Sequence, residues 1–380
     1  METDGRVGVL HVISGLGLGG AERMLLWSAR YHDRKLIRMG VVSLMSGGEL
    51  ADDIRREGVE VYELGQERGC LSVASFTRLM SIIREFEPQV LQGHMYHSNI
   101  LVRIAGTFAR NTAILSTRHI DHEPAVRRFI NRATGFLNDG TLVFSQRVFD
   151  EEMKENLFRR PVKLVRYGID IPDRPDTDPG AERRLEDERR SQLRENLMIP
   201  SDAFVWTAVG RLTKEKGFVN LINSYSRVHA AAAGSFLLIV GAGDDRRMLE
   251  DLAKEVGVAQ RVIFTGSRTD TMAILGISDA FVLSSPREGG PLVILEAMAA
   301  GLPVVSTRVG DVSSMVEEEK TGILVDPGNA RQLADAMNRI QNMGPGVREW
   351  GLRGRRRVEA HYDFRRTQRE MESYYQEVGR

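Results

Sequence analysis

Cysteine is almost absent from this sequence, which has one, Cys70, in 380 residues. A single cysteine excludes a disulfide within the chain and a cysteine-rich metal site, and we interpret Cys70 as an inert thiol. A surplus of charge is also absent, because 52 basic residues balance 52 acidic ones. This balance argues against a protein that binds nucleic acid through its bulk charge. We therefore expect no nucleic-acid partner. No metal-ligand spacing appears in the sequence either, and we expect no metal and no cofactor.

Long hydrophobic runs are missing too. No apolar stretch reaches the roughly 18 residues of a membrane span without an interruption. The first six residues are polar and acidic, unlike a signal peptide. We therefore expect a soluble, cytoplasmic protein. A chain of 380 residues exceeds the usual size of one hydrophobic core, which predicts two domains.

Short β-branched runs alternate with amphipathic stretches along most of the chain, and this alternation predicts an α/β protein with parallel sheets covered by helices on both faces. Two of the predicted helices span 21–31 and 72–87. The predicted strands are Val7–Ile13, Gly40–Leu44, Val59–Leu64, Gln89–Gln92, Ala113–Ser116, Thr141–Phe144, Val162–Arg166, Ala203–Val209, Phe236–Val240, Val262–Thr265, Ala280–Ser284, Pro303–Ser306 and Ile323–Val325.

Prolines and a dense charge run interrupt the alternation between Gly168 and Ser201. We interpret this segment as a linker followed by an exposed helix. It predicts two doubly wound domains, residues 1–168 and 169–361, with a terminal helix over 362–380 that packs back on the first domain. In open parallel sheets ligands bind outside the carboxyl ends of the strands, so the cleft between two such domains is the expected site.

The segment from Glu288 to Glu296 is the most informative in the chain. Two carboxylates flank a Gly-Gly-Pro turn and the first turn of an apolar helix, and Glu296 is the only ionisable residue from Gly289 to Thr307. A lone carboxylate in so apolar a run is costly to bury unless hydrogen bonds reach it. Glu296 could bind a ligand with paired hydroxyls, or it could form a structural ion pair with an arginine elsewhere in the chain.

A glycine-rich loop, Gly15–Arg23, follows the first predicted strand and contains G-x-G-x-x-G at Gly15, Gly17 and Gly20. This pattern is found in dinucleotide-binding proteins, which favours an NAD-dependent oxidoreductase. The acidic residue that should end the second strand is missing, because Met45-Ser46-Gly47-Gly48 stands there. The loop can also serve as a general anion-binding turn before a helix, or as a tight turn without a ligand.

Two further loops follow strands in the second half. In Val209–Gly217 three cations, Arg211, Lys214 and Lys216, follow the strand, and Arg211 and Lys216 are suited to neutralise a departing diphosphate. Lys214 is expected to face solvent. The loop from Gly241 to Asp245 again places glycines between a strand and a helix.

Taken in order, these segments resemble the retaining glycosyltransferases of family 4, which have the GT-B fold. The resemblance rests on Gly19–Arg23, on the loop from Val209 to Gly217, on Gly241–Gly243 and on the E-x7-E motif from Glu288 to Glu296 with its tail Ala297–Val305. It extends from Val7 to the terminal helix, and the E-x7-E block is its most specific part.

The resemblance implies roles for particular residues, in a reaction that needs no metal. Arg211 and Lys216 would bind the diphosphate of a nucleotide sugar, Glu296 the ribose hydroxyls, and Glu288 the transferred sugar. Backbone amides at the start of the helix that contains Glu296, and glycines of the loops after the strands, would contact the phosphates. His119 would lie near the donor sugar. The implied binding set also includes Gly19, Gly20, Gly243, Gly290, Leu292 and Val293.

The chain departs from the family pattern at two places. Family members often read E-G-F-G where this chain has Glu288-Gly289-Gly290-Pro291, and Tyr167 stands where the family usually has asparagine. The first change concerns the shape of the sugar pocket, and the second concerns the hinge.

The activity implied is the transfer of a hexosyl or N-acetylhexosaminyl group, with retention, from a nucleotide sugar to a glycan or lipid-linked acceptor. Uridine is preferred as the base from family frequency alone. The acceptor is expected on the first domain, where Gln92–Asn99 supplies polar groups. A UDP-sugar epimerase of the same fold and a non-catalytic nucleotide-sugar binding module remain as alternatives.

Six arginines and two acids, Asp121 and Glu123, lie between Arg103 and Arg132. This basic stretch fits a solvated face, and it equally fits a surface that rests on anionic lipid. Peripheral contact with the inner face of the plasma membrane therefore stays open.

Overall fold

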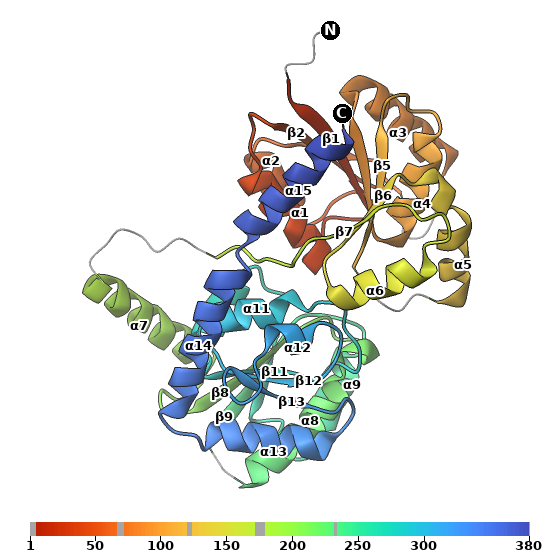
Figure 1. Cartoon of the computed structure of the whole chain (residues 1–380). Helices are drawn as coiled ribbons and strands as arrows, with labels where there is room; N and C mark the ends of the chain where they lie inside the picture. Colours follow the sequence, from red (N-terminus) through yellow and green to blue (C-terminus); the bar gives the residue numbers. More distant parts are fainter. Residues whose placement is uncertain (1–4, 67–71, 120–123, 172–178, 232–233, 380) are drawn as a thin grey trace. The chain divides into compact units, whose positions relative to one another are not determined.

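The structure is a computed structural model that describes residues 5–66, 72–119, 124–171, 179–231 and 234–379 (Figure 1). Cys70, Asp121 and Glu123 lie outside these ranges. The chain divides into two compact units: unit 1 comprises residues 1–170 and 363–380, and unit 2 comprises residues 171–362. Across the described ranges, no helix is both long and apolar enough to cross a bilayer.

Unit 1 is built on a parallel sheet of seven strands in the order β3-β2-β1-β4-β5-β6-β7. Its helix α15 comes from the end of the chain, packs against α1 and β1, and donates a hydrogen bond from Tyr375 Oη to Gln92 Oε1 over 2.6 Å. The elements are β1 Val7–Ile13, α1 Gly20–Tyr31, β2 Ile37–Ser43, α2 Ala51–Arg56, β3 Glu60–Glu63, α3 Val73–Phe86, β4 Val90–His94, α4 Met95–Gly106, β5 Ala113–Arg118, α5 Ala125–Ala133, η1 Gly135–Leu137, β6 Gly140–Val143, α6 Gln146–Glu155, β7 Val162–Leu164 and α15 Phe364–Val378.

Unit 2 is built on a parallel sheet of six strands in the order β10-β9-β8-β11-β12-β13. One face carries a large apolar cluster that includes Trp206, Tyr225 and Met337, and the other a smaller one that includes Val205 and Ile274. The elements are α7 Pro179–Asn196, β8 Phe204–Val209, η2 Lys214–Lys216, α8 Phe218–Ala231, β9 Ser235–Val240, α9 Arg246–Glu255, β10 Val262–Gly266, α10 Thr271–Gly276, β11 Ala280–Leu283, α11 Leu292–Ala299, β12 Val304–Thr307, α12 Val312–Met315, β13 Gly322–Val325, α13 Ala330–Gln341 and α14 Gly346–His361.

The predicted alternation of strands and helices is confirmed, since every strand expected from the sequence coincides with a strand of one sheet. The largest difference is at β2, which begins at Ile37 rather than Gly40. The prediction missed the start of this strand because Arg38 is charged, and a charged residue interrupts the hydrophobic pattern from which the strand was predicted. Its guanidinium lies over the Phe86 ring at 4.1 Å, so the residue covers apolar surface within the strand.

Candidate functional site

The strand order reverses direction between β8 and β11 in unit 2, and the loops that follow these two strands meet there. In a doubly wound sheet this switch point is where ligands bind. Ser284 Oγ donates to the carbonyl oxygens of Lys216 and Gly217 over 3.1 and 3.0 Å, which ties the β11 loop to the β8 loop. Thr307, at the end of β12, holds the same loop by donating to Ser285 O over 2.6 Å.

Lys216 and Glu288, both predicted site residues, form an ion pair at this switch point. Lys216 Nζ lies 2.6 Å from Glu288 Oε1, and Ser285 Oγ donates to the same oxygen over 2.7 Å. Among the described residues, Oε2 of Glu288 has no hydrogen-bond or ion-pair partner. The pair can therefore fix a cation in place while one carboxylate oxygen remains for a ligand hydroxyl.

Arg211 lies in the same β8 loop, and its side chain is exposed. Within the described ranges it makes no ion pair or side-chain hydrogen bond, so its planar fork is available to an anion. Lys214, expected to face solvent, is exposed. A recess beside these residues is lined by Gly217, Asn220, Ser284 and Pro286.

Glycines let the loops of unit 2 approach one another closely. Gly241 has a φ of +142°, and a Cβ there would overlap the carbonyl oxygen of Gly210. A Cβ at Gly243 would overlap the carbonyl oxygen of Leu212. The backbone amide of Leu212 in turn donates to Ala242 O over 2.9 Å. The predicted glycine turn after β9 therefore braces the cationic loop after β8.

Helix α11 carries the second half of the E-x7-E motif. It begins at Leu292, and Pro291 is its N-cap residue. No side chain caps this end, and the amides of Leu292 and Val293 belong to the first turn, which lacks intrahelical acceptors. Glu296 is buried within the helix, 5% exposed. One short helix thus carries first-turn amides without an intrahelical acceptor and a buried carboxylate.

The first glycine loop lies in unit 1 between β1 and α1. Gly19 is the N-cap of α1, and a Cβ there would overlap the carboxylate of Glu22, which folds back over the helix start. The strand β2 ends at Ser43 and is followed by Leu44 and Met45, so no carboxylate stands where a dinucleotide ribose would be bound. The predicted contact of Gly19 and Gly20 with phosphates stays a prediction.

Three histidines gather at the carboxyl ends of β1, β4 and β5. The sequence pointed to His119 and, within the segment Gln92–Asn99, to His94, but it did not point to His11. His11 Nδ1 lies 3.0 Å from His94 Nε2, and the rings of His94 and His119 stack with centroids 6.3 Å apart. His94 Nδ1 and His119 Nε2 are buried without a partner among the described residues. A histidine inside a strand, such as His11, carries no sequence signal that distinguishes it from a core residue.

Burial keeps these imidazoles uncharged. It lowers the pKa of His11 to about 3, with a smaller contribution from His32, and the pKa of His119 to about 4. Burial also lowers the pKa of His94 well below 6.5, with smaller contributions from the other two histidines. At neutral pH the cluster therefore offers neutral N–H donors and nitrogen acceptors rather than charge.

Tyr167, the departure from the family pattern, belongs to the same cluster. Its ring stacks on Phe144 at 5.4 Å, Phe144 stacks on His119 at 5.3 Å, and Tyr167 Oη donates to His119 O over 3.5 Å. The tyrosine therefore supports the backbone and ring of His119, a role that asparagine could not fill by stacking.

The segment Gln92–Asn99, expected to supply polar groups for the acceptor, lies in β4 and α4. Its second half is the first turn of α4. Gln92 Nε2 donates to Thr117 Oγ1 over 2.6 Å, and Asn99 bonds both the amide and the carbonyl of Thr117. These amides hold β4, β5 and α4 together. Only Tyr96 and His97 in this segment are partly exposed polar side chains that lie outside that network.

Among the side chains that the structure describes, no group of three or more His, Cys, Asp or Glu residues is arranged to hold a metal ion. Arg211, Lys216 and the amides of α11 are groups near the unit 2 switch point that could interact with negative charge.

Comparison with known proteins shows the family to which the chain belongs. Residues 189–357 match the family model described as Glycosyl transferases group 1, and residues 18–171 match that of Glycosyltransferase Family 4. The lipopolysaccharide core biosynthesis glycosyltransferase LpsD of Rhizobium meliloti (strain 1021) is 36% identical over 346 residues, which cover 90% of this chain and 90% of LpsD.

Solved structures show the same fold. Anabaena HepE in complex with UDP and glucose matches with a TM-score of 0.85 at 20% identity, over 98% of this chain and 100% of that one. Sucrose-phosphate synthase of Thermosynechococcus elongatus matches with a TM-score of 0.81 at 19% identity, over 98% and 99%. The predicted family and fold are thus confirmed, and the chain belongs to the family 4 glycosyltransferases and has the GT-B fold.

Proposed function

We propose that this glycosyltransferase moves a hexosyl or N-acetylhexosaminyl group from a UDP-sugar to a hydroxyl of a glycan or lipid-linked acceptor, with retention and without a metal. The observation that carries the proposal is the Lys216–Glu288 pair at the switch point of unit 2, beside Arg211. LpsD, named for lipopolysaccharide core biosynthesis, supports the acceptor class, and the HepE complexes support uridine.

In the proposed reaction the bond between the anomeric carbon and the diphosphate breaks, and the acceptor oxygen bonds that carbon on the same face. The acceptor proton passes to the departing phosphate oxygen. Arg211, Lys216 and the amides of Leu292 and Val293 stabilise the negative charge that grows on the leaving group. Glu296 would hold the ribose, and Glu288 a hydroxyl of the transferred sugar.

The acceptor would bind to unit 1, and the neutral histidine cluster supports this assignment. A sugar hydroxyl both donates and accepts hydrogen bonds, and uncharged imidazole nitrogens can satisfy either need. His119 would contact the donor sugar from this unit. The assignment of unit 1 to the acceptor and unit 2 to the donor follows from the different charges of the two switch points.

The test is a thermal-shift screen with UDP-, GDP- and ADP-sugars in the presence of a chelator, followed by assays of nucleotide release with a truncated lipopolysaccharide core. We expect stabilisation by a UDP-sugar, release of UDP that depends on the acceptor, and a product whose anomeric configuration by NMR matches the donor. An inverted product, or release that requires a divalent ion, would contradict the proposal.

The same assays separate the alternatives. Saturable enhancement of NADH fluorescence would favour an oxidoreductase instead. Interconversion of UDP-sugars without an acceptor would indicate an epimerase, and donor binding without UDP release would indicate a binding module.

A further inference from the structure

Helix α5 of unit 1 turns its apolar side outward. Val126, Phe129, Ile130 and Ala133 recur at the three- and four-residue spacing of one helix face, which in a globular protein normally faces the core. No residue of α5 is buried, however, and Val126 and Phe129 are 70% and 72% exposed. The apolar face therefore lacks the packing partner that its pattern calls for.

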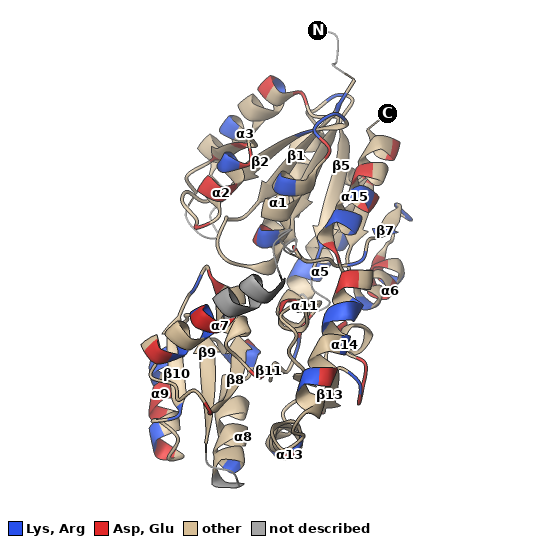
Figure 2. Cartoon of the chain, turned by 90° about the vertical axis from the view of Figure 1, so that its left-hand side faces the viewer, with Lys and Arg blue, Asp and Glu red and all other residues tan. Residues whose placement is uncertain are grey.

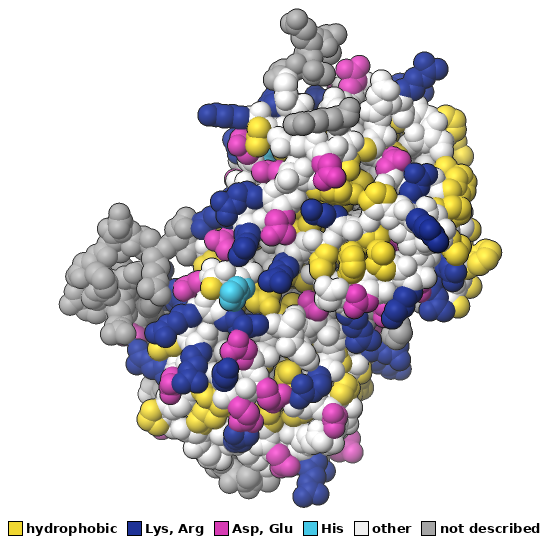
Figure 3. All heavy atoms as spheres, viewed as in Figure 1, with side chains coloured by type: hydrophobic (Ala, Val, Ile, Leu, Met, Phe, Trp, Pro, Cys, Tyr) yellow, Lys and Arg dark blue, Asp and Glu magenta, His cyan; other side chains and the backbone are white. Residues whose placement is uncertain are grey.

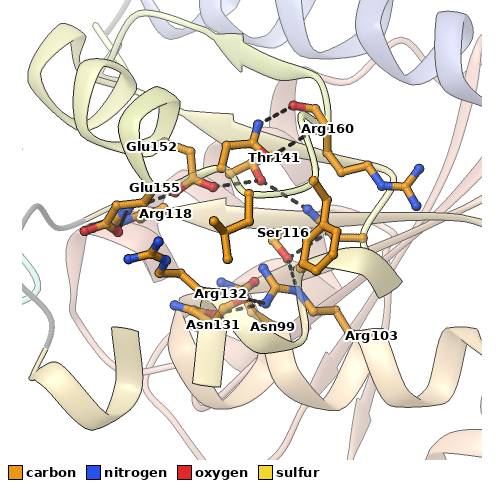
Figure 4. Close-up of a pocket in the computed structure, with 15 residues that line it drawn as sticks. Asn99, Arg103, Ser116, Arg118, Asn131, Arg132, Thr141, Glu152, Glu155 and Arg160 are labelled. Carbon is orange, nitrogen blue, oxygen red and sulfur yellow. Dashed lines mark hydrogen bonds and ion pairs between the residues drawn. The ribbon is translucent and has the colours of Figure 1, made fainter. Parts of the chain in front are cut away.

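The polar side of α5 faces the rest of unit 1. Arg103 Nη1 donates to both the carbonyl and the side-chain oxygen of Asn131 over 3.1 Å, as Figure 4 shows. Arg127 lies over the ring of Tyr96 at 5.1 Å, and Arg128 lies 3.8 Å from Glu155. These contacts hold the helix by its polar face, so the outward direction of Phe129 is fixed by the fold.

The polar pocket in Figure 4 belongs to this supporting layer. Arg118 is bound by Glu152 at 2.9 Å and Glu155 at 3.1 Å, and Arg103 also donates to Ser116 and Thr134. Arg118 is thus paired with carboxylates and Arg103 is held by neutral oxygens, so both guanidinium groups serve the fold, and we assign no ligand to the pocket.

Neighbouring segments extend the apolar face of α5. Phe136 in η1 and Leu157 and Phe158 after α6 are exposed, and the rings of Phe136 and Phe158 meet with centroids 5.8 Å apart. Figure 3 shows hydrophobic side chains gathered with Lys and Arg on this side of unit 1. We call the group the α5 surface; its members are Val126, Phe129, Arg132, Phe136, Leu157, Phe158 and Arg159.

The charge of the α5 surface has one sign. From Pro124 to Asn138 there are three arginines and no acid, and Arg159 and Arg160 directly follow Phe158. The nearby carboxylates of α6 are engaged, since Arg118 contacts Glu151, Glu152 and Glu155 and Gln146 donates to Asp150. By contrast, α9 of unit 2 carries acids and bases in equal number (Figure 2).

We propose that the α5 surface docks on an anionic phospholipid bilayer. The aromatic and aliphatic side chains would enter the boundary between headgroups and acyl chains, while the arginines extend to the lipid phosphates. A second copy of the chain fits less well, because a symmetric contact would bring the arginines of two α5 surfaces together. This proposal goes beyond the transfer reaction and does not depend on it.

The test is co-sedimentation of the full chain with vesicles, without nucleotide or acceptor. One set contains phosphatidylcholine alone, and the other phosphatidylcholine and phosphatidylglycerol in a three-to-one ratio. We expect binding to the anionic vesicles that weakens with salt. Replacing Val126 and Phe129 together by serine should reduce binding at least about tenfold. Arg132→Gln and Arg159→Gln should each reduce it about fivefold.

Matched changes in unit 2 provide the control. Met198→Ser with Leu352→Ser removes exposed apolar side chains, and Arg331→Gln with Arg353→Gln removes exposed cations. These variants should bind vesicles like the unchanged protein. Equal binding to neutral and anionic vesicles, equal losses in the unit 2 variants, or a dimer that the α5 change dissociates without vesicle binding would each overturn the proposal. Unaltered circular dichroism melting checks that every variant folds.

Discussion

Six strands follow the same order in both units, but the two switch points carry different chemistry. Unit 1 has β3-β2-β1-β4-β5-β6 where unit 2 has β10-β9-β8-β11-β12-β13. At the unit 2 switch point a cation from the β8 loop meets a carboxylate from the β11 loop. At that of unit 1 an imidazole of β1 meets an imidazole of β4. The same strand order thus carries charged side chains at the switch point of unit 2 and uncharged ones at that of unit 1. We call these two switch points the charged edge and the neutral edge.

The difference follows from what surrounds each group. Lys216 and Glu288 keep partial access to solvent, so an ion pair can persist there. His11 and His94 are enclosed, and enclosure disfavours their charged forms. The same topology therefore holds an ion pair at one switch point and uncharged imidazoles at the other, according to how deeply the side chains are buried.

Removing the cations of the unit 2 edge tests this contrast with the largest expected effect. Arg211→Ala and Lys216→Ala should each reduce transfer by about 10²-fold or more, because in the proposed reaction each removes a preorganised group that would stabilise the leaving diphosphate. Steady-state kinetics with the donor varied measures the loss. Lys214→Ala, an exposed cation of the same loop, is the matched control and should retain activity. Near-full activity in both test variants would remove the charged edge from the mechanism.

The close packing of the unit 2 loops predicts a large effect on stability. Gly241→Ala combines an unfavourable positive φ with a clash against Gly210 O and should destabilise unit 2 by about 2 kcal/mol or more. Gly257→Ala is the control, because Gly257 also has a positive φ, +77°, but no atom lies within 4 Å of a Cβ placed there. Urea unfolding gives the free energy of unfolding of each variant, and the difference between the two isolates the clash. Equal losses of stability would show that the loops can move apart.

The sequence predicted the unit 2 edge far better than the unit 1 edge. Loop cations and a carboxylate inside an apolar helix are local anomalies, so Lys216, Glu288 and Glu296 were visible in the pattern. The pairing of Lys216 with Glu288 was not, because it joins loops 72 residues apart. His11 and His94 become neighbours only through the pairing of β1 with β4, which no local pattern encodes.

The outward direction of α5 could not be predicted either. Its 3.6-residue pattern is that of a helix packed on a core, and the exposed apolar face results from contacts with Arg103, Tyr96 and Glu155. The basic stretch that the sequence revealed from Arg103 to Arg132 therefore has two parts. Arg103 and Arg118 hold the interior of unit 1, and Arg132 lies on the α5 surface.

Replacing Glu296 tests whether this buried carboxylate of unit 2 binds the ligand or only stabilises the fold. Glu296→Gln keeps the shape but removes the charge, and loss of charge-assisted hydrogen bonds to ribose should raise the KM for the donor about tenfold. Inorganic pyrophosphate, used as a competitor, lacks a ribose. The unchanged protein and Glu296→Gln should therefore bind it with the same affinity. A lower melting temperature with an unchanged KM would instead assign Glu296 to a structural ion pair.

Acidification should weaken the neutral edge of unit 1 and is the smallest effect expected. His119, whose pKa falls from 6.5 to about 4 on folding, binds fewer protons in the folded than in the unfolded state, so its contribution to stability is complete above pH 6.5 and is lost as the pH falls toward 4. The loss should be on the order of 1 kcal/mol within the first pH unit below 6.5. Urea unfolding across this window measures it. His119→Asn should reduce the slope by the part that His119 contributes, leaving that of His11 and His94, whereas His361→Gln, which replaces an exposed histidine of unit 2, should not reduce it. A wild-type slope unaffected by His119→Asn would show that this imidazole stays accessible to protons, and the contrast between a charged and a neutral edge would then fail at unit 1.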